Sequence, residues 1–173
     1  MKNFFEHFGV EVSFLPDLEK IRKRYLQISR ENHPDFSVGN SDEDYEQALM
    51  ATSLNNQAWK TLNDTDERIK YVLDLLNVSL TQEDKLSTSF LMEMMEWNER
   101  ITDAQMEENM EEIKNISTDF ALIETQTNDR LMSKIEAFER SGDKNILTEI
   151  KEIYLQRKYI LRLRNSIDKF AAL

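Results

Sequence analysis

The stretch that decides the fold of the first half of the chain runs from residue 17 to 36 and is DLEKIRKRYLQISRENHPDF. Proline and aspartate favour the first turn of a helix, so Pro16 and Asp17 mark a helix start. Four apolar residues then recur at helical spacing: Leu18, Ile21, Tyr25 and Ile28. Pro34 cannot continue a helix and pushes the residue before it toward extended backbone. The stretch therefore predicts an amphipathic helix to about Glu31, followed by a loop.

The other face of this helix is strongly basic. It carries Lys20, Arg22, Lys23, Arg24 and Arg30. The loop begins with the tripeptide His33-Pro34-Asp35, directly after these cations. Proline and aspartate are common in turns. From average composition, this tripeptide occurs by chance in roughly one of every hundred chains of this length. The tripeptide alone is therefore moderately specific, and its surroundings must add to it.

Three further helices are expected around this helix and loop. Phe4, Phe5 and Phe8 precede Gly9, which predicts a short first helix with a glycine C-cap. A third helix is expected from the capping pattern at Ser41. It includes Tyr45, Leu49, Thr52, Leu54, Ala58, Trp59 and Leu62. A fourth helix is expected over about Glu67–Leu76.

The second half of the chain predicts three amphipathic helices. They are expected over about 84–103, with Thr81 and Asp84 as a cap, then 106–140 and 144–170. Short connections between such helices are typical of an antiparallel bundle. We therefore expect an all-α protein with one domain over residues 1–76, a connector over 77–83 and a three-helix bundle over 84–173.

Composition supports the helices and excludes several classes of function. Of 173 residues only three are glycine and two proline, the net charge is −11, and cysteine is absent. Few turn formers argue against strands, and the acidic balance argues against a nucleic-acid partner. We expect no thiol, metal or cofactor site and no catalytic site. No run of about 18 apolar residues occurs, and the N-terminus MKNFFEHFGV does not resemble a signal or transit peptide, so we expect no membrane partner and a cytoplasmic location.

The first half resembles the J-domain, in which two antiparallel helices are joined by a His-Pro-Asp loop. The matching residues are Tyr25, His33, Pro34, Asp35, the pair Asn55 and Trp59, and the series Asp64, Arg68 and Tyr71. The resemblance implies docking on an ATPase chaperone and stimulation of its ATP hydrolysis. It assigns the electrostatic contact to Arg22, Lys23, Arg24 and Arg30, and the trigger to His33, Pro34 and Asp35. One departure is Phe36, because many J-domains have lysine after the tripeptide.

The whole chain resembles the HscB family of co-chaperones, through the segment Phe90-Leu91-Met92-Glu93 and the stretch Gln156–Ile160. The resemblance implies two partners, an HscA-like chaperone and the iron–sulfur cluster scaffold IscU. It maps the scaffold-binding surface to Leu91, Met92, Met95, Glu96, Glu99, Asp103 and Tyr159. Helical spacing predicts that Phe90, Met94 and Trp97 point inward instead.

Three alternatives stay open at this point. Leu91, Met92 and Met95 are also consistent with an ordinary helical core. The bundle is also consistent with a different client protein, or with dimerisation of the chain. A carboxylate metalloenzyme is excluded, because its bundle would need Glu-x-x-His pairs and the second half contains no histidine.

Overall fold

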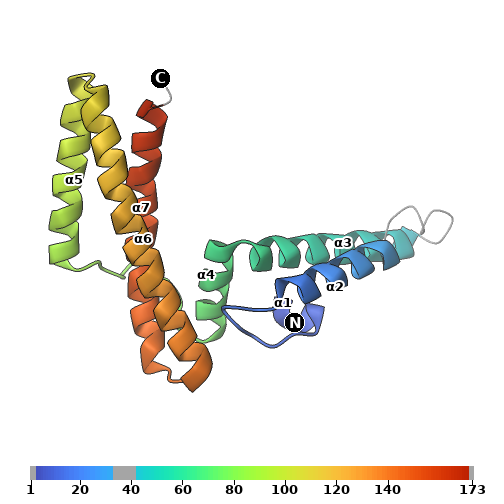
Figure 1. The fold of residues 1–173 in the computed structure, drawn as a ribbon. Helices are drawn as coiled ribbons and strands as arrows, with labels where there is room; N and C mark the ends of the chain where they lie inside the picture. Colours follow the sequence, from blue (N-terminus) through green and yellow to red (C-terminus); the bar gives the residue numbers. More distant parts are fainter. Residues whose placement is uncertain (1–2, 33–41, 172–173) are drawn as a thin grey trace. The chain divides into compact units, whose positions relative to one another are not determined.

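The computed structural model describes residues 3–32 and 42–171, and in these ranges it consists of seven helices without a strand (Figure 1). The prediction of an all-α fold is therefore confirmed. The chain divides into two compact units, Met1–Ser79 and Leu80–Leu173. Each unit is described by itself below.

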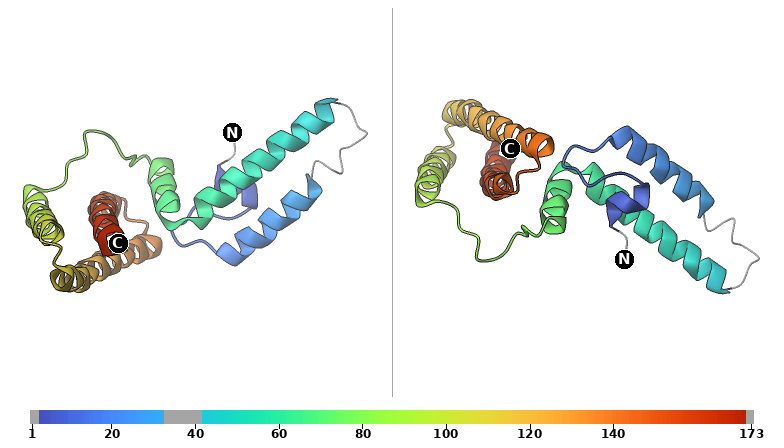
Figure 2. Two further views of the ribbon diagram at one scale, coloured as in Figure 1. Left: turned by 90° about the horizontal axis from the view of Figure 1, so that it is seen from above. Right: turned by 90° about the horizontal axis from the view of Figure 1, so that it is seen from below.

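The first unit contains four helices. They are α1 (Phe4–Phe8), α2 (Leu18–Glu31), α3 (Asp42–Asn63) and α4 (Thr65–Leu75). Helices α2 and α3 lie side by side as an antiparallel hairpin in Figures 1 and 2, and α1 packs against both. The predicted His33-Pro34-Asp35 loop and the predicted cap at Ser41 lie outside the described residues.

Helix caps fix the bounds of the short helices. Asn3 forms a capping box with Glu6 at the start of α1, and Gly9 ends that helix with a φ of 67°, in the left-handed region that glycine adopts at low cost. Asp17 caps α2 by accepting from the backbone N–H of Lys20 at 2.9 Å. Asp64 caps α4 in the same way, so that helix begins earlier than the spacing predicted.

The core of the first unit is built from aromatic and aliphatic side chains of all four helices and of the segment between α1 and α2. Its largest fully buried members are Phe5, Phe14, Ile21, Leu62, Ile69 and Leu73. The face of α3 that packs inward consists of Ala48, Asn55, Ala58 and Leu62, and small side chains at two of these positions permit close helix packing. By contrast, Tyr45, Leu49 and Leu54 are exposed, as is Leu18 on α2.

The second unit contains α5 (Thr88–Met106), α6 (Met110–Ser141) and α7 (Asn145–Ala171). Helices α6 and α7 form a long hairpin that turns at Gly142, where φ is 65°. Helix α5 packs along one half of this hairpin, and Figure 2 shows the three helices nearly end-on. Their shared core consists of Met94, Ile101, Ala104, Ile113, Ile116, Phe120, Ile160, Leu163 and Ile167.

The predicted start of α5 near residue 84 is wrong. Asp84 does accept from the backbone N–H of Thr81 at 2.6 Å, but it closes a turn and pairs with Lys151 of α7 at 2.6 Å. The bond to Lys151 and the bond from Thr81 hold the pKa of the Asp84 carboxyl below its ordinary value. Ser87 caps the helix instead, because its hydroxyl accepts from the backbone N–H of Phe90.

Candidate binding surfaces

The basic residues of α2 are exposed and form a belt around the helix. Arg22, Lys23, Arg24 and Arg30 have no ion pair with any residue in the described ranges. Lys23 and Arg30, seven residues apart, point away from the buried Ile21 and Ile28, while Arg22 lies toward one flank. The predicted basic residues therefore surround the exposed half of α2 and do not share one narrow face.

One apolar residue lies within this belt and was not identified from the sequence. Leu26 is 44% exposed, whereas Ile21 and Ile28 of the same helix are buried. Leu26 does not continue the helical spacing of Ile21 and Ile28 and lies three residues after Lys23. That position was the signal in the sequence that its side chain faces outward. The belt thus combines cations with one apolar contact point.

Asn55 ties α1, α2 and α3 together beneath the belt. Its side chain is 1% exposed. Its Nδ2 donates to the carbonyl of Tyr25 at 3.1 Å and to Oγ of Ser29 at 2.9 Å. Its Oδ1 accepts from Nε2 of His7 at 3.1 Å. A buried amide with all these partners fixes the register of the hairpin, since each bond lost inside the core is costly.

The aromatic partner in the Asn–Trp pair has a packing role as well. The ring of Trp59 stacks on Tyr25 with centroids 5.1 Å apart. The Tyr25 hydroxyl also donates to Oδ1 of Asn56 at 3.0 Å. These contacts join α2 to α3 along the hairpin, so the paired residues of this motif position the basic helix.

The Asp-x-x-x-Arg-x-x-Tyr series holds the other end of the unit. Arg68 is 6% exposed; its Nη1 donates to the carbonyl of Leu62 at 2.6 Å and its Nε to that of Phe14 at 3.0 Å. Burial lowers the pKa of this guanidinium, and the nearby Asp64 opposes that effect. Tyr71 stacks on Phe4 at 4.7 Å, and its hydroxyl accepts from the Phe4 N–H at 3.0 Å.

The outer face of α5 presents most of the residues assigned to scaffold binding. Met92 is 60% and Met95 67% exposed, and Glu96, Glu99 and Asp103 are exposed beside them. Four of these residues and Asn98 line a hollow of about 520 Å³. The inward residues are Met94, fully buried, with Phe90 and Trp97 packed against the core, as predicted. The alternative that the two outer methionines are core residues is therefore excluded.

The two remaining predicted residues lie together in a second depression. Leu91 is 36% exposed and lines a groove of about 450 Å³ with Tyr159 of α7. The Tyr159 ring meets Phe90 edge-on, with centroids 5.9 Å apart. The predicted set thus divides between the outer face of α5 and a groove formed by α5, α7 and the segment before α5.

Seven residues that line the groove were not assigned to a binding surface from the sequence. They are Asp84, Lys85, Leu86, Thr88, Leu155, Lys158 and Arg162. Three of them lie with Tyr159 on α7 at spacings of three, four and seven residues from Leu155, which places them on one helix face. That spacing was the signal available in the sequence.

Arg100 braces the inner edge of α5 against α6. Its Nε donates to Glu112 at 2.7 Å, its Nη1 to Asp119 at 3.2 Å, and its guanidinium lies 5.2 Å from the centre of the Trp97 ring. These bonds, chiefly the one to Glu112, raise the pKa of Arg100. Arg100 is therefore bonded to α6 and packed on the tryptophan, and it forms none of these bonds with the acidic side chains of the outer α5 face.

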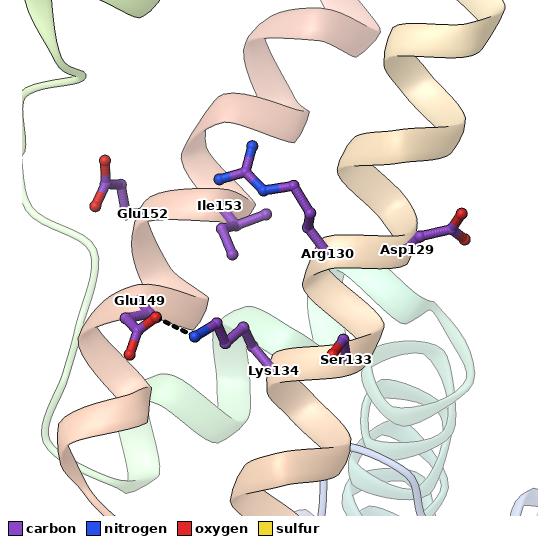
Figure 3. A pocket seen from close by; sticks show the side chains of 7 residues that line it. All are labelled: Asp129, Arg130, Ser133, Lys134, Glu149, Glu152 and Ile153. Atoms are coloured by element: carbon purple, nitrogen blue, oxygen red, sulfur yellow. Dashed lines mark ion pairs between the residues drawn. The ribbon is translucent and has the colours of Figure 1, made fainter.

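A third groove, between α6 and α7, contains none of the predicted residues. Figure 3 shows Arg130 reaching from α6 over Ile153 of α7, while Lys134 forms an ion pair with Glu149. Its charges are of both signs and partly paired across the two helices. This groove therefore reflects the packing of the hairpin and is not part of either candidate surface.

Two findings concern metal ions and membranes. Within residues 3–32 and 42–171, no group of three or more His, Cys, Asp or Glu side chains is placed to hold a metal ion. None of the helices in those ranges is long and apolar enough to cross a membrane.

The fold first defines the class of protein: a J-domain with an α2–α3 hairpin, followed by a three-helix bundle. Comparison with known proteins then gives the family. The family model for the HscB C-terminal oligomerisation domain matches residues 86–168. The co-chaperone protein HscB of Proteus mirabilis is 31% identical over 121 residues, which cover 69% of this chain and 68% of that protein.

Two mammalian proteins agree with this. The iron–sulfur cluster co-chaperone protein HscB of mouse is 36% identical over 115 residues, or 65% of this chain and 49% of the mouse protein. The crystal structure of human co-chaperone protein HscB superposes with a TM-score of 0.79 at 27% identity, and covers 100% of this chain and 84% of the human chain. The chain belongs to the HscB family of co-chaperones.

Proposed function

We propose that this co-chaperone acts in iron–sulfur cluster assembly in the cytoplasm as an adaptor without catalytic activity of its own. In this proposal the J-domain stimulates the ATPase of an HscA-like chaperone, and the bundle delivers the scaffold IscU to it. The observation that carries the proposal is the outward presentation of Met92 and Met95, next to Leu91, on a helix whose core is already complete. Exposed apolar residues in such a group are typical of a protein interface.

The belt on α2 supports the chaperone contact. Its four cations are exposed and have no ion pair within the described residues, so they remain available to an acidic partner surface. Complementary charges steer such an encounter and fix its orientation. In the proposal His33, Pro34 and Asp35 then form the trigger, with the belt as the dock.

The outer face of α5 supports the scaffold contact. Methionine side chains adapt to an irregular partner surface because they are unbranched and polarizable. The carboxylates of Glu96 and Glu99 line the same hollow, and Asp103 is exposed further along α5. Polar side chains at the rim of an apolar centre are the usual anatomy of an interface. This part of the surface suits a partner that brings apolar and basic side chains.

The chaperone half of the proposal is tested in the loop. His33→Gln and Asp35→Asn should abolish most of the stimulation of the chaperone's single-turnover ATP hydrolysis. The helical content and the melting temperature of each variant should stay at the wild-type value, which circular dichroism checks. Wild-type stimulation by either folded variant would contradict the assignment of the trigger.

The scaffold half is tested with the double variant Leu91→Ala, Tyr159→Ala. Truncating apolar anchors at an interface centre costs about 1–2 kcal/mol or more, which is roughly a five- to thirtyfold loss of affinity. Calorimetry should show this loss, while stimulation of the chaperone without scaffold stays unchanged. Leu122→Ala is the matched control, because Leu122 is 62% exposed on α6 and lines neither depression. Equal scaffold affinity in the folded double variant would place the client elsewhere.

A second candidate function is self-association of the bundle, or binding of a different client. The matching family model is described as an oligomerisation domain, which favours self-association as the alternative. Sedimentation velocity over a roughly hundredfold range of protein concentration tests whether the chain associates with itself. A dimer that the Leu91→Ala, Tyr159→Ala variant disrupts would assign the surface to a second copy of the chain.

A further inference from the structure

The groove between α5 and α7 is lined by more cations than anions, although the chain as a whole is acidic. Its floor is apolar, formed by Leu86, Leu91, Leu155 and the Tyr159 ring. Three cations line it, Lys85 from the segment before α5 and Lys158 and Arg162 from α7. The net charge of the chain is −11, so a local excess of cations around an apolar floor requires an explanation.

The single acidic residue that lines the groove does not pair with Lys85 or Arg162. Asp84 is already bonded to Lys151, with 2.6 Å between Oδ1 and Nζ, and to the backbone N–H of Thr81. Lys85 and Arg162 are exposed and form no ion pair with another described residue. The groove therefore presents the positive charges of Lys85 and Arg162 next to partly exposed apolar side chains.

The outer face of the same helix has the opposite sign. Glu96, Glu99 and Asp103 are exposed there, beside Met92 and Met95. Leu91 lies at the edge between the two regions, since it lines the groove and is four residues from Met95. A partner that covers both regions meets positive charge on one side of Leu91 and negative charge on the other.

We infer that the groove receives an acidic segment of the scaffold, in which a carboxylate lies next to an apolar side chain. This inference rests on the proposed function, and it specifies the chemistry of the partner at that surface. The apolar side chain packs on Leu91 and Tyr159, and the carboxylate meets Lys85 and Arg162. A guanidinium can hold a carboxylate through two parallel hydrogen bonds, which adds orientation to the contact. The two oppositely charged regions together then fix the direction in which the scaffold lies across the bundle.

The test is calorimetry with the full chain and purified scaffold, using the double variant Lys85→Glu, Arg162→Glu. Affinity should fall on the order of tenfold or more, and binding should become less sensitive to added salt. The control is Lys114→Glu, Lys144→Glu, which makes the same change in net charge at two exposed lysines outside the groove. The control should bind like the wild type, apart from any small uniform effect of net charge.

The carboxylate itself is located by changing exposed Asp and Glu residues of the scaffold to Asn and Gln one at a time. At least one such change should weaken binding to the wild-type chain but have no further effect on the Arg162→Glu variant. If the groove variant binds as well as its control while Leu91→Ala, Tyr159→Ala loses affinity, the acidic segment is refuted and the proposed function stands. If the wild-type chain does not bind the scaffold, both are refuted.

Discussion

Arg68 offers a quantitative test of how the first unit is held together. Its guanidinium is buried and donates to the carbonyls of Leu62 and Phe14, at 2.6 and 3.0 Å. Arg68→Met keeps much of the side-chain volume and removes both of these bonds, together with a longer one from Nη2 to the hydroxyl of Thr65 at 3.4 Å. Each bond from a charged donor contributes about 1.5–3 kcal/mol. Burying the charge costs part of that gain, as the lowered pKa indicates. The net loss in the free energy of unfolding of this unit should be about 2–4 kcal/mol.

The two tryptophans make this loss measurable in the full chain. Trp59 lies in the first unit and Trp97 in the second. In a Trp97→Phe background, the fluorescence of Trp59 reports urea or thermal unfolding of the first unit. For a domain of this size the expected loss lowers its midpoint by roughly 10 to 25 °C. In the complementary Trp59→Phe background, the midpoint reported by Trp97 should change little.

A matched variant separates charge from geometry. Arg68→Lys keeps the positive charge but cannot donate to both carbonyls from one planar group, so its loss should lie between those of wild type and Arg68→Met. The reasoning is refuted if the free energy of unfolding of Arg68→Met lies within about 0.5 kcal/mol of that of its parent, because ordinary surface substitutions have effects of that size. It is also refuted if lysine is as harmful as methionine, because the charge would then contribute nothing.

The remaining predictions concern one contact each. Changing Arg22, Lys23 and Arg24 to Glu should weaken chaperone stimulation, and wild-type stimulation should fall as salt rises; a curve flat in salt would count against the belt. Tyr71→Phe should cost the first unit about 1 kcal/mol by the same urea assay, because the first amide of α1 loses its acceptor. The pKa of Asp84 is depressed in the fold, so its ion pair stabilises above the carboxyl's ordinary pKa and is lost as pH falls through the folded value. Asp84→Asn should therefore flatten the acid limb of a thermal-midpoint profile followed by circular dichroism, and an unchanged slope would argue against the pair.

Local sequence patterns were sufficient for the helices and most of their ends. The spacing of Ile21 and Ile28, the start signal at Pro16 and Asp17, and Gly9 after α1 all agree with the observed elements. These features depend on residues within one or two turns of each other, so periodicity and capping preferences determine them. The inward positions of Phe90, Met94 and Trp97 followed from the same periodicity.

The start of α5 could not be obtained in that way. The pattern at Thr81 and Asp84 matches a helix cap, and its hydrogen bond does form. Asp84 is bonded in addition to Lys151 of α7, which is far away in the chain, and the helix begins only after Ser87. A capping pattern shows which hydrogen bonds a residue is able to form. Whether a helix begins at that residue also depends on its tertiary contacts.

What the sequence by itself determined is the all-helical fold, the basic α2 ahead of the His-Pro-Asp motif, and the stretch of α5 that bears the outer methionines. The tertiary structure decided how side chains from separate helices combine. It placed Leu91 and Tyr159 in one groove, lined that groove with Lys85 and Arg162, and gave Asn55 and Arg68 their buried partners. The physical reason is range: helix formation depends on neighbours in sequence, while a groove and its charge exist only after helices far apart in the chain have packed against each other.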